Sequence, residues 1–297
     1  MRALLVLIAV LALGLALPAQ QPPAPPLYSP EWYQQFHGPY SAPVEPFRIV
    51  GNIHYVGAAN IAAYLIATSG GHILIDTGTV EMHRGLVDSV ATLGFRTGDI
   101  KIVLSSHAHF DHIAGHAVMK RLTGAQVFAM AGDADALESG RDTSALGAVG
   151  WEPVKVDRVL RDGETVSLGG TTLRAVHAPG HTKGATTWFT EVQDGGRRYV
   201  VAYLGGTTPN AGVPLLNNPR HPGLIEETRR TLQRLQREAV PDIYLPGHPQ
   251  AMFAGKVARL HAGERPHPLL NADAWRAQLA SAETDFEQRV ARERAAH

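Results

Sequence analysis

Residues 102–112 constrain the fold and the chemistry of this 297-residue chain more than any other segment. The segment opens with a short apolar run from Ile102 to Leu104, which has the length and composition of a buried strand. Three histidines and one aspartate follow directly: His107, His109, Asp111 and His112. Because ligands in open α/β sheets usually bind beyond the carboxyl ends of strands, we expect these side chains to line a site.

Metal binding is the chemistry that suits this spacing. His107 and His109 lie two residues apart, so both rings can face the same side of an extended segment. The side chains of Asp111 and His112 are then expected to face a second position beside the one that His107 and His109 share. Neutral imidazole and carboxylate are ligands that zinc binds at about 2.0–2.2 Å. A histidine-rich surface loop is the alternative, but a fixed pattern of three His and one Asp favours a metal site.

The pattern His-x-His-x-Asp-His after a strand resembles the signature of the metallo-β-lactamase superfamily. The resemblance extends over about residues 30–290. It implies an α/β fold, a four-layer αββα sandwich in which two mixed β-sheets are flanked by helices. Short apolar runs and Gly-rich turns predict strands between 47 and 75 and between 156 and 203. Apolar stripes at helical spacing over 224–235 and over 275–290 predict two outer helices, the second capped by Asn271.

The middle of the chain carries weaker signals. Helical spacing predicts helices over 80–93 and 114–123, and 132–151 is expected to be mostly loop with one short helix. We interpret His116 as a residue that is near the site or at the surface, and not as a ligand. His177 is expected to pack within its strand.

Two further histidines lie on Pro/Gly turns that follow predicted strands. By the resemblance, the Gly-His-Thr turn at His181 completes the first metal's set, which is His107, His109 and His181. His248, in a later Gly-His turn, is the candidate that gives the second metal the set Asp111, His112 and His248. Asp76 ends another strand and resembles the superfamily's acid that orients ligating histidines.

The sequence departs from many relatives at Gly206. Most hydrolases of this superfamily with two metals, including glyoxalase II-like thioesterases and many lactonases, resemble one another in an Asp here that bridges both metals. One group of β-lactamases has a Cys, and Gly206 has no side chain with which to bind. The whole pattern is similar to the third subclass of metallo-β-lactamases. The resemblance implies that the next residues, with Thr207, Thr208 and Asn210 as candidates, contact the substrate carboxylate.

The resemblance implies a hydrolase with two Zn²⁺ ions per chain. Zinc lowers the pKa of bound water toward about 7, so a hydroxide on zinc is available as the nucleophile. The expected reaction is hydrolysis of the β-lactam amide bond of penicillins, cephalosporins and carbapenems, which confers antibiotic resistance. Asp111 is the expected catalytic residue, because it both binds metal and orients the water or relays its proton. The alternatives are a lactonase, thioesterase or esterase on the same fold, and a catalytically inactive zinc-binding protein.

The start of the chain predicts export. Residues 1–19 have one basic residue, an unbroken apolar run and a cleavage region typical of a signal peptide, and 20–30 form a Pro-rich linker. We expect one catalytic domain over 31–297, periplasmic or secreted, with no membrane anchor after processing. The chain has no Cys, so no disulfide or thiolate ligand is available.

Composition restricts the partners. The 27 basic and 27 acidic residues give a formal net charge of zero, without the basic face that nucleic-acid binding requires. We therefore expect no nucleic-acid partner. The resemblance implies a small-molecule β-lactam as the substrate, and we expect a monomer.

Overall fold

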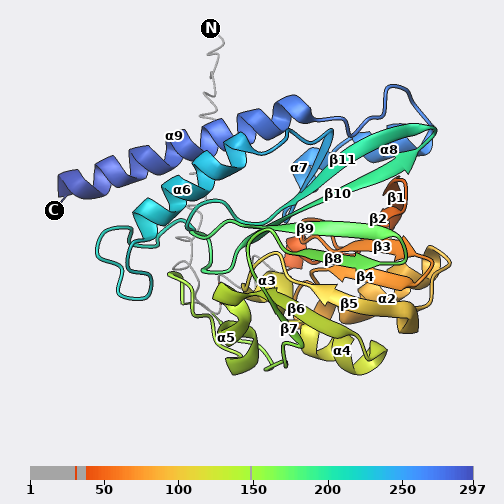
Figure 1. Cartoon of the computed structure of the whole chain (residues 1–297), viewed down its shortest axis with the longest axis horizontal. Helices are drawn as coiled ribbons and strands as arrows, with labels where there is room; N and C mark the ends of the chain where they lie inside the picture. Colours follow the sequence, from red (N-terminus) through yellow and green to blue (C-terminus); the bar gives the residue numbers. More distant parts are fainter. Residues whose placement is uncertain (1–30, 32–37, 148, 297) are drawn as a thin grey trace, which may run out of the picture.

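The computed structural model describes residue 31, residues 38–147 and residues 149–296. The predicted signal peptide (1–19) and Pro-rich linker (20–30) lie outside this part of the chain. The described chain forms two β-sheets that pack face to face, with helices on both outer sides (Figure 1). The predicted αββα sandwich is confirmed.

The first sheet has seven strands, whose order in the sheet follows the chain. Strands β1 to β4 pair antiparallel, and β4 to β7 pair parallel. The strands are β1 (Phe47–Val50), β2 (Ile53–Tyr55), β3 (Tyr64–Thr68), β4 (Gly71–Ile75), β5 (Ile100–Leu104), β6 (Gln126–Met130) and β7 (Arg158–Leu160).

The second sheet has five strands in the order β12-β11-β10-β9-β8. All neighbours are antiparallel except β11 and β12, so this sheet is also mixed. The strands are β8 (Thr165–Leu168), β9 (Thr171–His177), β10 (Thr186–Asp194), β11 (Arg197–Leu204) and β12 (Ile243–Pro246).

Helices cover the outer face of each sheet. The first sheet packs against α2 (His83–Thr92), α4 (His116–Thr123) and α5 (Ala131–Ser139), and the second against α6 (Leu224–Arg237) and α9 (Ala272–Ala296). The shorter helices are η1 (Val80–Met82), η2 (Thr97–Asp99), α3 (Phe110–Ile113), α7 (Gln250–Phe253) and α8 (Lys256–His261). In the described part of the chain, no helix combines the length and apolar character needed to cross a membrane.

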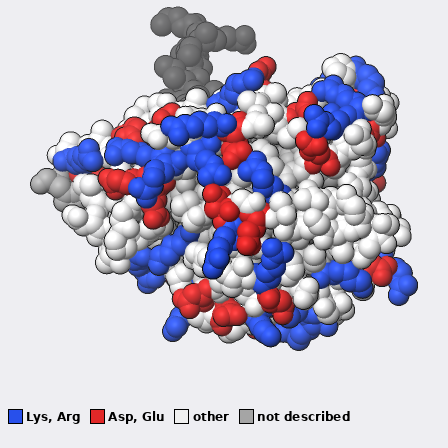
Figure 2. Space-filling model, viewed as in Figure 1, with Lys and Arg blue, Asp and Glu red and all other residues white. Residues whose placement is uncertain are grey.

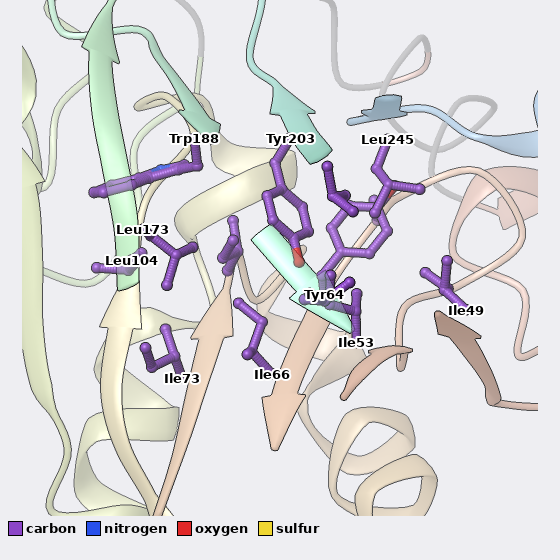
Figure 3. Packing of buried hydrophobic residues seen from close by; sticks show 14 of the residues in the cluster. Ile49, Ile53, Tyr64, Ile66, Ile73, Leu104, Leu173, Trp188, Tyr203 and Leu245 are labelled. Atoms are coloured by element: carbon purple, nitrogen blue, oxygen red, sulfur yellow. The ribbon is translucent and has the colours of Figure 1, made fainter. Parts of the chain in front are cut away.

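Successive side chains of a strand point to opposite faces of its sheet, so each strand contributes both to the core between the sheets and to the core under the helices. In β4, Ile73 and Ile75 belong to the core between the sheets, whereas Leu74 packs on the helical side. Figure 3 shows the layer between the sheets, where Ile66 of the first sheet lies opposite Trp188 and Tyr203 of the second. Each fully buried side chain of this size contributes about 1.5–3 kcal/mol. This rigid double sheet holds the strand ends that carry the candidate site.

Two predictions of local structure need correction. Asn271 does not cap α9 with its side chain, because its Oδ1 accepts the N–H of Tyr244 in β12 at 2.8 Å. The predicted helix over 80–93 is split into η1 and α2. Of the two positions expected for His116, the structure shows the one near the site: the side chain is fully buried, with Thr77 Oγ1 at 2.8 Å from Nδ1 and Ser105 Oγ at 3.1 Å from Nε2.

Candidate metal centre

The candidate centre lies where strands from both sheets end. Asp76 directly follows β4, and His107 to His112 follow its parallel neighbour β5. In the second sheet, Gly205 follows β11 and His248 follows the parallel strand β12. The two edges are joined by hydrogen bonds, since Trp188 Nε1 donates to Ser105 O at 3.1 Å and Ala62 N donates to Gly247 O at 2.9 Å.

The structure brings the six predicted ligands together in two groups of three. His107, His109 and His181 form the first group, and Asp111, His112 and His248 form the second. Within each group, one ligand atom from each residue lies within 4.8 Å of the others. The ring centroids of His107 and His112 are 4.0 Å apart, so the groups are adjacent. The short helix α3 produces this division by turning Asp111 and His112 away from the preceding extended segment.

Each of the five histidines has one ring nitrogen held by a group outside the two sets of ligands, and the other nitrogens of His109 and His181 lie 3.1 Å apart. In the first group, His107 Nδ1 lies 3.0 Å from Ser106 Oγ, and His109 Nε2 lies 3.2 Å from Ser144 Oγ. His181 Nδ1 donates to the carbonyl of Thr208 at 2.7 Å. In the second group, Nδ1 of His112 and His248 donate to Asp76 Oδ2 and Asn60 O. Such partners set the tautomer and aim the other nitrogen toward a metal.

Asp76 connects the two groups, in the position that the sequence predicted for an orienting acid. Its Oδ2 lies 3.0 Å from His112 Nδ1 and 2.5 Å from Ser106 Oγ, and its Oδ1 accepts the N–H of Ser106 at 2.7 Å. Ser106 in turn contacts His107. Asp76 has a φ of +60°, a left-handed conformation that is uncommon outside glycine and that the surrounding hydrogen bonds hold in place.

A second buried acid, Asp133, connects the two loops of the first group. Its Oδ2 accepts the N–H of Ala108, between His107 and His109, at 2.8 Å. The same atom accepts the hydroxyl of Thr182 at 2.6 Å, and Oδ1 accepts the N–H of Gly184 at 2.7 Å. Burial outweighs these hydrogen bonds and raises the pKa of the Asp133 carboxyl above its ordinary value.

The donor set fits a metal ion. His112 Nε2 is buried and has no hydrogen-bond partner among the described residues, with Asp111 Oδ2 too distant at 3.7 Å. Burial, only partly opposed by Asp111, lowers the pKa of His109 to about 4, and burial together with the neighbouring His109 lowers that of His181 to about 3, so both rings are neutral at pH 7. Burial opposes ionisation of Asp111, but the histidines around it, His112 first, outweigh that effect and lower its pKa. Neutral imidazoles and an ionised carboxylate are the forms that bind metals.

An open cavity of about 480 Å³ lies over both groups. Its walls include the three residues predicted to contact substrate, Thr207, Thr208 and Asn210, together with Gln278 of α9. None of the described residues that line it is Lys or Arg. The volume is typical of a small-molecule site.

Gly206 is packed against the first group. A Cβ built at this position would lie 2.0 Å from Cδ2 and Cγ of the His181 ring, a distance that no real structure tolerates. The ring of His181 therefore occupies the space that any side chain at position 206 would need.

Sequence reasoning missed several of the supporting residues. Ser144 and Asn60 are single polar residues in loops and carry no signal of their own. Asp133 was detectable in principle, because it is an acid that follows a buried strand closely, as Asp76 does.

Comparisons with known proteins agree with this geometry. A model of the metallo-β-lactamase superfamily matches residues 56–248. Among solved structures, native FEZ-1 metallo-β-lactamase from Legionella gormanii has a TM-score of 0.82 at 34% identity, covering 86% of this chain and 99% of that one. BJP-1, a subclass B3 metallo-β-lactamase of Bradyrhizobium japonicum, has a TM-score of 0.81 at 34% identity and coverages of 87% and 98%.

Curated sequences give shorter matches. The hydroxyacylglutathione hydrolase of Acidiphilium cryptum is 29% identical over 127 residues, and a probable metallo-hydrolase of Burkholderia pseudomallei is 31% identical over 105 residues. These matches span 43% and 34% of the length of the two relatives. The superfamily model, by contrast, matches more than half of this chain. The chain therefore belongs to the metallo-β-lactamase superfamily, and subclass B3 β-lactamases are among its structural neighbours.

Proposed function

We propose that this protein hydrolyses the amide bond of β-lactam antibiotics and uses two zinc ions. The observation that carries the proposal is the contact between Gly206 and the His181 ring, which leaves no space for a side chain at position 206. The superfamily's thioesterases resemble one another in a bridging Asp at this position, so this centre is built differently from theirs. The near-complete coverage of two solved β-lactamases supports the same reading.

His107, His109 and His181 would hold one zinc ion, and Asp111, His112 and His248 the other. Zinc supplies, when bound, a water that ionises near neutral pH and a Lewis acid for the carbonyl oxygen of the substrate. The chain itself supplies Asp111, whose Oδ2 lies 3.5 Å from His248 Nε2 at the floor of the cavity. We propose that this carboxylate orients the attacking water and takes its proton.

The cavity suits a small substrate that carries one carboxylate. Because no Lys or Arg is among the described residues that line it, an anionic group would meet neutral donors from Thr207, Thr208, Asn210 and Gln278. Asn210 Oδ1 is buried without a hydrogen-bond partner among the described residues. As an acceptor it would pair with an N–H or O–H group of the substrate and not with its carboxylate.

Hydrolysis of a thioester is the second candidate function. Hydroxyacylglutathione hydrolases are among the curated relatives, which favours this reaction. Glutathione thioesters carry two carboxylates, however, and the described walls of the cavity offer no cationic side chain to pair with them. The additional carboxylate, which would have no cationic partner in these walls, favours a β-lactam over a glutathione thioester.

Ultraviolet absorbance assays with a carbapenem, a cephalosporin and S-lactoylglutathione would test the proposal. We expect turnover of the two β-lactams, loss of turnover after chelation, and recovery when zinc is restored. Turnover of the thioester alone would replace the proposal with the second candidate. Two bound zinc ions without hydrolysis of any β-lactam, lactone or thioester would indicate a zinc-binding protein without catalysis.

We also propose that the enzyme is exported, acts as a monomer and protects the cell from β-lactams. The basis for export is the sequence of residues 1–19, which is typical of a signal peptide. Cell fractionation with N-terminal sequencing of the mature protein would test export. Antibiotic susceptibility of a host that expresses the full chain would test protection, with His248→Ala as the inactive control.

A further inference from the structure

The segment between β11 and α6 forms one wall of the cavity and has no regular structure of its own. Residues 205–223 contain neither helix nor strand, although they include Thr207, Thr208 and Asn210. The carbonyl of Thr208 also accepts the Nδ1–H of His181. Irregular segments of this length are uncommon in compact domains and are usually functional, so their backbone groups need partners from elsewhere.

Arg289 of α9 supplies three of these partners. Its Nη1 donates to the carbonyl of Pro209 at 2.6 Å, and its Nη2 donates to the carbonyls of Asn210 and Val213 at 3.0 and 3.3 Å. The guanidinium group is planar and presents its donors in a fixed fork, so one side chain fixes three points of the segment. Two of these points directly follow Thr208.

Glu293 lies one helical turn further along α9 and holds the next part of the segment. Its Oε2 accepts the N–H groups of Leu215 and Leu216 at 2.8 and 3.1 Å. Residues four apart in a helix share one face, so Arg289 and Glu293 present a donor and an acceptor side by side. In Figure 1 the segment, drawn in teal, lies toward the same end of the molecule as the C-terminal half of α9.

We propose that Arg289 and Glu293 are positioning residues that hold the 205–223 segment against α9, so that its substrate-facing side chains are set before substrate binds. Neither residue is needed for the chemistry itself. The anchoring is independent of which substrate is used, whereas its effect on KM rests on the proposed function. Sequence reasoning assigned only the apolar stripe of α9, so these two charged residues were not singled out.

Hydrogen exchange measured by mass spectrometry on the zinc-loaded protein tests the anchoring without any substrate. In Arg289→Ala and Glu293→Ala, we expect peptides within 205–217 to exchange at least about tenfold faster, with the rest of the protein unchanged. Glu293→Gln keeps an acceptor oxygen and should restore most of the protection. Arg276→Ala is the matched control, because Arg276 lies on the same helix and pairs with Asp273 at 3.0 Å instead of with the segment.

Steady-state kinetics then tests the positioning. With a β-lactam, Arg289→Ala should raise KM about fivefold and change kcat less than about twofold, which is the signature of lost substrate binding. Unchanged exchange in 205–217 in both alanine variants would overturn the proposal, as would faster exchange throughout the protein. A kcat loss with unchanged KM would also overturn it. If the parent protein hydrolyses no β-lactam, the proposed function fails, but the exchange result still decides the anchoring.

Discussion

Oδ2 of Asp76 accepts a hydrogen bond from Nδ1 of His112 at 3.0 Å, deep inside the protein. Through Ser106, the same carboxylate also supports His107 in the other group of ligands. One acid therefore orients a histidine in each group.

Asp76→Asn should weaken metal binding at both groups. An amide keeps one acceptor atom but loses the other, and asparagine tolerates the left-handed backbone at this position. Loss of such an orienting partner typically costs about 10- to 100-fold in metal affinity. Competition with a chromophoric chelator measures the affinity, and Asp88→Asn on the exposed side of α2 is the control. A variant that binds two zinc ions as tightly as the parent would exclude this role for Asp76.

His248→Ala should empty or weaken the second group and leave the first intact. The His248 side chain is 43% exposed and follows β12, so its removal disturbs little of the core. Asp111 and His112 would remain as two ligands, one fewer than catalytic zinc sites normally use. Metal analysis after dialysis should therefore give about one zinc per chain. Two tightly bound zinc ions in this variant would show that His248 is not a ligand.

Gly206→Ala should damage the first group specifically. The new Cβ would lie 2.0 Å from the His181 ring, so the ring must move or the backbone must shift. A displacement of about 1 Å in a catalytic site can cost on the order of 100-fold in rate. We expect at least that loss of hydrolysis, together with weaker binding of one zinc. Gly85→Ala is the control, because an added Cβ there meets nothing within 4 Å. Full activity in Gly206→Ala would remove the main support for the proposed function.

Asp133→Asn should affect the first group alone, in contrast to Asp76→Asn. Asp133 accepts hydrogen bonds from the loops on either side of the first group, and the amide would lose one acceptor. We expect affinity for one zinc ion to fall about tenfold or more, with the second ion retained. Chelator competition resolves the two ions, and Asp135→Asn at an exposed position of α5 is the matched control. Equal weakening of both ions would point to a general loss of stability.

The sequence predicted most of the fold and all six candidate ligands, for reasons that can be traced to particular residues. His107, His109, Asp111 and His112 are contiguous, so their convergence depends only on a strand, a turn and a short helix. His181 and His248 lie far along the chain, but each sits on a Gly-containing turn after a strand, where the superfamily pattern places a ligand.

The supporting contacts were not predictable in the same way. Asp133 reaches Thr182 across 49 positions, and Arg289 reaches Pro209 across 80. Apart from the position of Asp133 shortly after a buried strand, nothing in the sequence of α5 or α9 distinguishes these residues from ordinary polar positions on a helix. Such contacts depend on how helices pack over sheets, and a single sequence carries little information about that packing. The charge pattern offers no further guide, because basic and acidic residues are interspersed over the face shown in Figure 2.

His54 and His72 should make the metal-free protein less stable in acid. Both are buried, and their rings lie edge-on to Phe95, at centroid distances of 4.9 and 5.0 Å. Burial lowers the pKa of each below the ordinary value of 6.5, because a proton on either ring would be poorly solvated.

The direction of the pH effect follows from the protonation state of the two rings in the folded and in the unfolded protein. The folded state favours the neutral rings, whose Nδ1 atoms have no hydrogen-bond partner among the described residues, whereas the unfolded chain binds protons below about pH 6.5. The stabilisation is therefore fully present above pH 6.5 and is lost as the pH falls below it.

Urea unfolding of metal-free protein at pH 7.5, 6.0 and 5.0 measures this loss. In His54→Phe/His72→Phe the decrease in unfolding free energy between pH 7.5 and 5.0 should be smaller than in the parent, and His83→Phe, at a less buried position, should leave it unchanged. Because the ligand histidines titrate equally in all three proteins, their contribution cancels in the comparison. An identical decrease in the double variant and the parent would show that these two histidines do not cause the acid sensitivity.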